Sequence, residues 1–512
     1  MLVAVGILCS RITGLVRQRV FSHYFGLRND SADAFTAAFR IPNFLQNLFG
    51  EGALSASFIP VYASLLARGR RKEADRVAGA VASLLSLVVA VIVLIGVVAT
   101  PLLIDAIAPG FHGDKRELTI AIVRVLFPGA GLFVVSAWCL GVLNSHHKFL
   151  LSYASGVMWN VAMIVTLLMF GAGQSLPRLA MTLAWGSVIG SALQFAVQLP
   201  VVWRVAPDLR FGLDTTSEHV RAIGRSFVPV LISRGVNQIS AYVDQLIASL
   251  LGTGAVTGLQ NASTLYTLPV SLFGMSVSAA ELPAMSGIAT GDAASLEALR
   301  TRLNAGLRRI AFFVVPSAVA FLALGDVVVG ALFQTGRFGH SDSLYVWRIL
   351  AGSAVGLLAS TLGRLYSSTY YALRDTRTPL NYALVRVALT TVLGYVCAKP
   401  LPMWLGLAPE WGAAGLTASA GVAGWIEMLM LRRTMNARIG KTGLPVSYVA
   451  SLWTSALVGA AIGWGIKLAL PALHPIVAAV VVLGPFGLVY FGGTLALHVP
   501  EAKSVVGRLF RT

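Results

Sequence analysis

The chain has 512 residues, of which 12% are charged and 56% are hydrophobic, and its mean hydropathy is +0.77. Soluble domains carry about 25% charged residues, so this composition excludes a soluble globular protein and indicates a chain embedded in a membrane. The net charge of +18 would suggest nucleic-acid binding in a soluble protein, but the basic residues lie mostly in short loops between apolar stretches. We therefore expect no nucleic-acid partner.

Apolar stretches of about 20 residues or more, long enough to cross about 30 Å of hydrocarbon, recur from one end of the chain to the other. They predict an all-α polytopic membrane protein with 14 transmembrane helices. In chain order these helices are expected at 2–27, 32–63, 77–108, 119–144, 150–172, 180–203, 224–252, 256–290, 306–334, 343–372, 379–398, 411–432, 447–470 and 474–498.

Basic residues are concentrated in alternate loops. They are frequent at 68–76, 204–225 and 432–441, whereas the intervening loops hold few, such as Lys115 and Arg337. Because cytoplasmic loops carry the excess of Lys and Arg, this alternation predicts that both termini are cytoplasmic.

An internal repeat divides the chain. Ser10-Arg11 recurs as Ser233-Arg234, Leu48-Phe49-Gly50 as Leu272-Phe273-Gly274, and Pro60 as Pro283, at offsets of 223 or 224 residues. Two six-helix lobes related by a pseudo-two-fold axis would produce this pattern. The predicted parts are an N-lobe at 1–204, a cytoplasmic inter-lobe loop at 205–222, a C-lobe at 223–435, two added helices at 446–498 and a cytoplasmic tail at 499–512.

The first predicted helix carries Arg11, Gly14 and Arg17 within about two helical turns. Charges at membrane depth usually face a cavity or pair with one another. Two guanidinium groups separated by a glycine suit a diphosphate, which arginine binds bidentately. The alternative is that both side chains extend to the interface, or pair with Asp33 and Glu51.

Asp33 and Arg40 lie in the second predicted helix, which Pro42 can interrupt. We expect a functional or gating role for this pair, with a structural ion pair as the alternative. In the second half, Arg234 repeats Arg11 and Asp244 follows on the same helix. Asp244 is a candidate for a coupling cation or proton, or else a structural partner of Arg234 or Arg386.

Sequence motifs of enzymes and cofactor sites are incomplete. Gly440-Lys441-Thr442 resembles the end of a phosphate-binding loop, but Met435 stands where its first glycine would be. His146-His147 has no second ligand cluster nearby, and no nucleophile motif is placed for catalysis. The sequence therefore predicts a transporter without an organic cofactor, and not an enzyme.

Several motifs resemble the MurJ (MviN) family of lipid II flippases, within the multidrug/oligosaccharidyl-lipid/polysaccharide exporter superfamily. They are Ser10-Arg-Ile-Thr-Gly-Leu-Val-Arg17, Asp33-Ala-Phe, Arg40-Ile-Pro-Asn43, Phe49-Gly-Glu-Gly-Ala-Leu-Ser-Ala-Ser-Phe-Ile-Pro60 and Tyr371-Ala-Leu-Arg-Asp-Thr-Arg-Thr-Pro379. The resemblance implies two six-helix lobes around a cationic cavity, a groove made with the last two helices for an undecaprenyl tail, and a role in peptidoglycan biosynthesis and cell shape at the bacterial inner membrane.

The resemblance also implies roles for single residues. Ser10, Arg11 and Arg17 match positions that contact the lipid II diphosphate, and Asp33 and Glu51 match acidic positions of the second helix. Asp244 matches a proposed sodium ligand, with Asn381 as a companion. The predicted substrate-binding set is Ser10, Arg11, Gly14, Arg17, Asp33, Arg40, Glu51, Arg234 and Thr264, and the predicted ion site is Asp244 with Asn381.

Three positions depart from the family pattern. Gln18 stands where many members have an acidic residue, and Gln46 and Thr264 replace arginines. Either Arg234 or another basic residue compensates, or the first helix alone holds most of the headgroup.

The expected function is the translocation of lipid II from the cytoplasmic to the periplasmic leaflet by alternating access, energised by the membrane potential or by a sodium or proton gradient. The alternatives are a flippase for another polyprenyl-diphosphate-linked glycan, or a drug or cation exporter of the same superfamily. The protein is expected to act as a monomer, with the cell-wall synthesis machinery as its partner.

Overall fold

The computed structural model describes residues 2–288, 292–471 and 473–509, and every regular element in these ranges is a helix. Side chains are described for all of them except residues 2–8, 42, 50–52, 55, 149, 150, 152, 153, 232–241 and 506–509. The contacts divide the chain into two compact units. Unit 1 comprises 1–257 and 335–338, and unit 2 comprises 258–334 and 339–512. The predicted lobes, with boundaries at 204 and 223, are a different division and stay a prediction.

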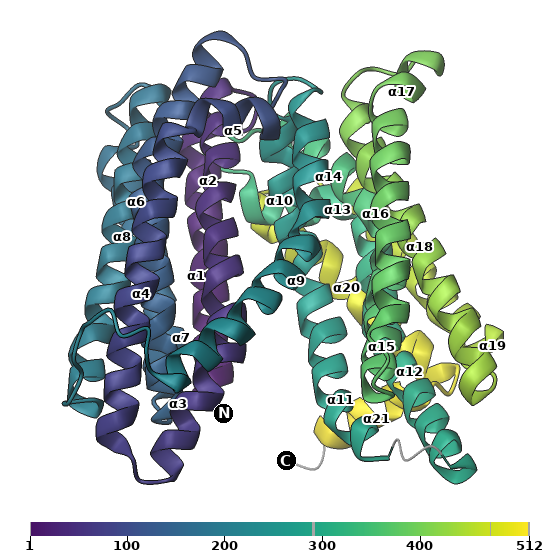
Figure 1. Cartoon of the computed structure of the whole chain (residues 1–512). Coiled ribbons are helices and arrows are strands. Elements are labelled where there is room, and N and C mark those ends of the chain that lie inside the picture. The colour runs from purple at the N-terminus through teal and green to yellow at the C-terminus, as the bar shows by residue number, and fades with distance from the viewer. Residues whose placement is uncertain (1, 289–291, 472, 510–512) are drawn as a thin grey trace. The chain divides into compact units, whose positions relative to one another are not determined.

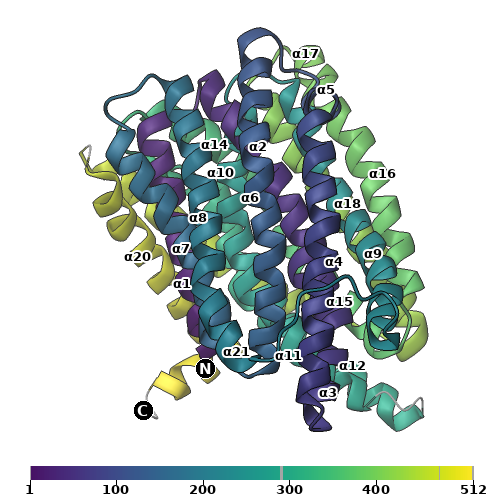
Figure 2. The ribbon, with the colours of Figure 1, turned by 60° about the vertical axis from the view of Figure 1, so that its left-hand side comes forward.

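Unit 1 holds the first elements of the chain and the start of α10. They are α1 (Leu2–Phe25), α2 (Asp30–Leu48), η1 (Phe49–Leu54), α3 (Ser55–Ala67), α4 (Arg71–Val98), α5 (Thr100–Ile107), α6 (Gly113–Ser145), α7 (Phe149–Phe170), α8 (Leu176–Val205), α9 (Glu218–Ser249) and α10 (Ala255–Pro269). Helix α6 packs against α2, α4 and α8, and α7 packs between α1 and α8 (Figures 1 and 2).

The core of unit 1 forms where its helices pack closely, at α4 and α6 and at α7 and α8. Trp138 of α6 is buried, and its indole N–H donates a hydrogen bond to the carbonyl of Ala78 in α4 at 3.1 Å. Gly190 of α8 lies against Trp159 and Ala162 of α7, where an added Cβ would be about 3.0 Å from their atoms. Small residues at such crossings let helix backbones pack closely in a membrane.

Unit 2 holds most of α10 and all later helices. They are η2 (Val270–Met275), α11 (Ser276–Ile288), α12 (Ala293–Ala323), α13 (Gly325–Phe333), α14 (His340–Ala354), α15 (Leu357–Ala372), α16 (Arg377–Ala398), α17 (Pro400–Trp404), α18 (Trp411–Ile439), α19 (Val446–Ala469), α20 (Pro475–Ala496) and α21 (Pro500–Leu509). Helix α18 packs against α14, α15 and α16, while α19 pairs with α20 and with α12.

Each of the 14 predicted spans coincides with one helix or with consecutive helices, which is consistent with that number. Within the described ranges, nine helices are long and apolar enough to cross a membrane, or ten if α14 and α15, bent by 41°, form one span. The structure confirms the predicted all-α membrane fold.

The internal repeat is also visible in the backbone. Elements η1 and η2 are π-helical turns, and each contains the Phe-Gly pair of the repeat, Phe49-Gly50 and Phe273-Gly274. Each is followed by a helix with a proline inside it, Pro60 in α3 and Pro283 in α11. A π turn holds one more residue than the α-helical turn it replaces, and such turns are frequent at functional sites.

Candidate functional site

One face of α1 packs on α7 through small and polar residues. A Cβ added to Gly14 would lie 3.9 Å from Oδ1 of Asn160, and one added to Gly156 would lie 3.2 Å from the hydroxyl oxygen of Ser10. Arg11, one residue beyond Ser10, is exposed. Among the described side chains, no carboxylate forms an ion pair with Arg11.

Arg17 is held by aromatic rings. Its Cζ lies 5.0 Å from the ring centroid of Phe39 on α2 and 5.0 Å from that of Trp159 on α7. These two rings stack on each other with a centroid distance of 5.1 Å and an angle of 5°. A cation over two aromatic faces is attracted by both ring quadrupoles without being neutralised. No described carboxylate forms an ion pair with Arg17, so its charge is available to an anion.

Trp159 is itself fixed by its neighbours. Its indole N–H donates to the hydroxyl of Ser187 on α8 at 3.0 Å, and Phe133 on α6 meets it edge-on with a centroid distance of 5.0 Å. Three helices therefore position the ring that holds Arg17. The sequence did not predict the roles of Phe39 and Trp159. Aromatic residues are common in apolar helices, and the sequence does not show which of them will contact a cation.

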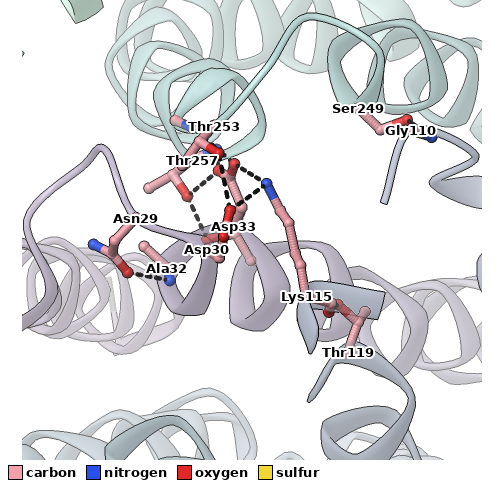
Figure 3. A network of polar contacts seen from close by, with 12 residues as sticks. Asn29, Asp30, Ala32, Asp33, Gly110, Lys115, Thr119, Ser249, Thr253 and Thr257 are labelled. Carbon is pink, nitrogen blue, oxygen red and sulfur yellow. Dashed lines mark hydrogen bonds and ion pairs between the residues drawn. The ribbon is translucent and has the colours of Figure 1, made fainter. Parts of the chain in front are cut away.

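Asp33 lies at the centre of a polar network around the start of α10 (Figure 3). Its fully buried carboxylate accepts hydrogen bonds from Nζ of Lys115 at 2.8 Å, from the backbone N–H of Gly254 at 2.7 Å, and from the backbone N–H and hydroxyl of Thr257 at 3.0 and 2.8 Å. Backbone N–H groups at a helix start favour an anion. Asp33 therefore ties α2 to α10 and to α6.

Lys115 also contacts the exposed Asp30 at 3.3 Å, and Asp30 accepts a hydrogen bond from the hydroxyl of Thr253 at 2.9 Å. In the sequence, Lys115 is one of the few basic residues of the loops predicted to be periplasmic. The scarcity of basic residues in these loops was the feature of the sequence that could have indicated a specific role for Lys115. The predicted participation of Asp33 in substrate binding stays a prediction, since its oxygens are occupied in this structure.

Arg40 and Asp244 are brought together within unit 1. Asp244 of α9 exerts an attractive electrostatic effect on Arg40 of α2, and the hydroxyl of Tyr242 donates to the backbone carbonyl of Arg40 at 3.3 Å. The positive charge of Arg40 would repel a cation that binds at Asp244.

The remaining predicted residues lie apart from these contacts or outside the described side chains. The side chains of Glu51 in η1 and Arg234 in α9 are outside the description. Thr264 of α10 belongs to unit 2, where its hydroxyl donates to the carbonyl of Gln260 at 2.9 Å. Asn381, the predicted companion of Asp244, is exposed on α16 of unit 2. Among the described residues, no group of three His, Cys, Asp or Glu could hold a metal ion.

Ion pairs neutralise charged side chains in the helices of unit 2. Glu281 of α11 pairs with Arg302 at 2.5 Å and with Arg309 at 3.6 Å, both on α12. Arg386 of α16 pairs with Glu427 of α18 at 3.1 Å. Arg11 and Arg17 of α1 have no described carboxylate partner, and the same holds for the exposed Arg124 of α6 and Arg364 of α15.

The loop motif Tyr371-Ala-Leu-Arg-Asp-Thr-Arg-Thr-Pro379, one of those that resemble the family, has a structural explanation. Asp375 accepts hydrogen bonds from the backbone N–H and the hydroxyl of Thr378 at 3.0 and 2.7 Å, and pairs with Arg438 at 2.7 Å. The hydrogen bonds from Thr378 and the charge of Arg438 lower the pKa of Asp375 to about 2. This carboxylate closes the turn between α15 and α16.

Comparison with known proteins gives a consistent result. Residues 21–484 match the family model described as lipid II flippase MurJ. The lipid II flippase MurJ of Burkholderia cenocepacia is 31% identical over 83% of this chain and 80% of its own length. The probable lipid II flippase MurJ of Bdellovibrio bacteriovorus is 32% identical over 84% of this chain and 80% of its own length.

Solved structures share the fold. A lipid II flippase MurJ in an inward closed conformation matches with a TM-score of 0.79 and 22% identity, covering 97% of this chain and 99% of that structure. An inward-facing multidrug transporter of the MATE family matches with a TM-score of 0.65 and 18% identity, covering 83% of this chain and 98% of that structure.

Proposed function

This chain belongs to the MurJ family of lipid II flippases, and from that premise we propose that Arg11 and Arg17 of α1 receive the diphosphate of lipid II during its transfer between leaflets. The family is bacterial, and the chain is a multi-pass membrane protein of it. The observation that carries the proposal is Arg17, a guanidinium held over Phe39 and Trp159 without a described carboxylate partner.

The geometry at Arg17 suits a diphosphate for electrostatic reasons. The rings hold the guanidinium in place while leaving its positive charge uncompensated, so phosphate oxygens can bind it bidentately. Arg11 lies about two turns away on the same helix and is exposed, so it can reach the second phosphate group. Gly14 keeps the space between them free of a side chain.

The transport cycle that we propose is alternating access with both termini in the cytoplasm. The headgroup of lipid II enters from the cytoplasmic side and leaves on the periplasmic side, while the undecaprenyl tail stays in lipid along α19 and α20. The protein acts as a monomeric transporter and not as an enzyme, serving the cell-wall synthesis machinery. A sodium or proton gradient, acting at Asp244 with Asn381, or the membrane potential supplies the energy.

Two alternatives differ in the substrate. A flippase for another polyprenyl-diphosphate-linked glycan would use the same arginines, because the diphosphate is common to both lipids. A drug or cation exporter, as in the MATE-like neighbours, would need uncompensated acidic side chains at the substrate site. The unneutralised charges described on α1 are basic, which favours an anionic substrate.

The test is lipid II translocation in proteoliposomes, combined with complementation of a strain depleted of its own lipid II flippase. Loss of a charge-assisted hydrogen-bonding group is worth about 1.5–3 kcal/mol, so Arg17→Ala and Arg11→Ala should each slow translocation about tenfold to a hundredfold. The exposed Arg178→Ala is the matched control and should leave the rate unchanged. Normal lipid II translocation by both Arg11→Ala and Arg17→Ala would contradict the proposal. Transport of an O-antigen-type lipid at the same rate as lipid II would favour the alternative of a flippase for another polyprenyl-diphosphate-linked glycan.

A further inference from the structure

A cavity of about 430 Å³ lies within unit 2, where α19 ends and α20 begins. Helices α13, α14, α19 and α20 contribute to its wall. Most of the wall is apolar, and it includes Val327, Leu470, Leu473, Pro475, Ala478 and Val482. Both α19 and α20 are long and apolar enough to cross a membrane. The junction of two such helices places the cavity at the depth of lipid headgroups.

The polar part of the wall is centred on an ion pair between the buried Asp326 and the half-buried Lys467. Asp326 of α13 is 6% exposed, and its Oδ2 accepts a hydrogen bond from Nζ of Lys467 at the end of α19. Its Oδ1 is buried, and no donor in the described part of the chain reaches it. A buried carboxylate oxygen without a donor is costly, so this atom favours a ligand that brings an N–H or O–H group.

The other polar groups of the wall are hydrogen-bond donors. Lys467 has two further N–H bonds on its ammonium group, which lies 4.9 Å from the ring centroid of Trp464. Gln334 accepts a hydrogen bond from Ser343 through its amide oxygen at 3.3 Å, so its amide N–H groups remain as donors. His340, which is exposed, adds a ring N–H. Ammonium, amide and imidazole donors together suit phosphate oxygens.

We propose that this cavity binds the headgroup of a phospholipid with a primary amine, of the ethanolamine type. The ammonium of the lipid donates to Oδ1 of Asp326, its phosphate accepts from Lys467 and its neighbours, and the first methylene groups of its acyl chains contact the apolar wall. A metal ion is disfavoured there, because the described residues offer a single carboxylate. The site is separate from the α1 arginines and takes a bilayer lipid, not the transported one.

The experiment uses the purified full-length chain and counts bound lipid by native mass spectrometry, with thermal unfolding as a second readout. The probes are dioleoyl phosphatidylethanolamine, dioleoyl phosphatidylcholine and dioleoyl phosphatidylglycerol. The choline lipid keeps the phosphate but has no N–H group, and the glycerol lipid keeps the phosphate without a positive charge. The ethanolamine lipid should bind about tenfold more tightly than either, as expected for one charge-assisted hydrogen bond.

Two variants test recognition of the amine and recognition of the phosphate separately. Asp326→Asn should remove the preference for ethanolamine over choline, and Lys467→Gln should weaken binding of all three lipids. Glu410→Gln is the matched control, because it alters the 3.0 Å ion pair with Arg348 in the same unit without lining the cavity. It should keep the preference of the wild-type chain.

Equal binding of the ethanolamine and choline lipids by the wild-type chain would overturn the proposal, as would equal binding of the glycerol lipid. If Asp326→Asn does not fold, a competition experiment on the wild-type chain tests the proposal instead. Soluble glycerophosphoethanolamine should displace the bound lipid and glycerophosphocholine should not, and equal displacement by both would also overturn it. None of these readouts depends on lipid II translocation.

Discussion

Asp33 accepts hydrogen bonds from both the backbone N–H and the hydroxyl of Thr257, the residue 224 positions later and its counterpart in the internal repeat. Asp30 accepts a hydrogen bond from the hydroxyl of Thr253, which lies 223 positions later. These hydrogen bonds therefore join positions that correspond in the repeat, and they hold the start of α2 against the start of α10 within unit 1.

Replacing Asp33 with Asn should destabilise the protein strongly. The change removes the charge that pairs with Lys115 and favours the start of α10, and breaking a buried ion pair costs about 3–5 kcal/mol. Asp30→Asn is the matched control, because Asp30 is exposed and contacts the same Lys115 at a longer distance. Thermal unfolding in detergent measures both, and similar melting temperatures for the two variants would contradict this account.

Trp159→Leu should weaken lipid II binding while leaving the fold intact. The substitution keeps an apolar side chain but removes one of the two rings over Arg17, and a desolvated cation–π contact is worth about 2 kcal/mol, which corresponds to a loss of affinity of about tenfold to thirtyfold. Trp185 of α8 is an exposed tryptophan, so Trp185→Leu is the control.

A double-mutant cycle tests whether Trp159 acts through Arg17. If it does, Trp159→Leu should have little further effect on lipid II affinity in an Arg17→Ala background, because the group that it positions is gone. Equal losses of affinity in the two backgrounds would show that the ring acts independently of Arg17.

The loop between α15 and α16 should show a defined pH dependence. The pKa of Asp375 is lowered to about 2 in the folded chain, against an ordinary value of 3.8. A depressed carboxyl pKa stabilises the fold fully above the ordinary value, and this contribution is lost as the pH falls through about 2. Asp375→Asn should therefore cost about 1–2 kcal/mol at pH 7.

The difference in stability between the wild-type chain and Asp375→Asn should shrink as the pH falls from about 5 to about 3. Thermal unfolding across this range measures it. Glu297→Gln, in an exposed ion pair with Arg300, is a control that should have little effect at any pH. A constant difference for Asp375→Asn would refute the assignment.

Two glycines of α18 should respond differently to alanine. A Cβ on Gly421 would lie 2.7 Å from the backbone nitrogen of Gly356, whereas one on Gly424 would meet no atom within 4 Å. Gly421→Ala should therefore destabilise the protein by about 1–3 kcal/mol through overpacking. Gly424→Ala should be neutral or stabilise it by up to about 1 kcal/mol, because alanine favours a helix. Melting temperatures in the reverse order would contradict the packing described for α15 and α18.

The helical fold could be predicted from the sequence, because the thickness of hydrocarbon dictates the length of an apolar span and leaves no choice but a helix. The Phe-Gly repeat could also be found, since it is carried by identical residues. The partners of the charged side chains could not. Lys115 is 82 residues from Asp33, and Glu427 is 41 residues from Arg386. Such pairings depend on which helices become neighbours, and composition does not determine this.

Only the charged residues of the candidate site could be predicted from the sequence. Arg11 and Arg17 stand out because arginine is costly at membrane depth. The rings of Phe39 and Trp159 do not, because aromatic residues are ordinary components of membrane helices. The pairing of Asp326 with Lys467 was equally hidden, since these residues lie in different predicted spans, 141 positions apart, and composition does not show which spans become neighbours.

The two π turns have a consequence for the history of the chain. A π turn arises when one residue is inserted into an α-helix. Elements η1 and η2 each carry such an insertion beside the repeated Phe-Gly pair, and they overlap when the halves are aligned on the repeat. An insertion shared at one place by both halves is most simply older than the duplication. The single ancestral half would then already have had an interrupted helix at this position, and an intact helix there would be a later state.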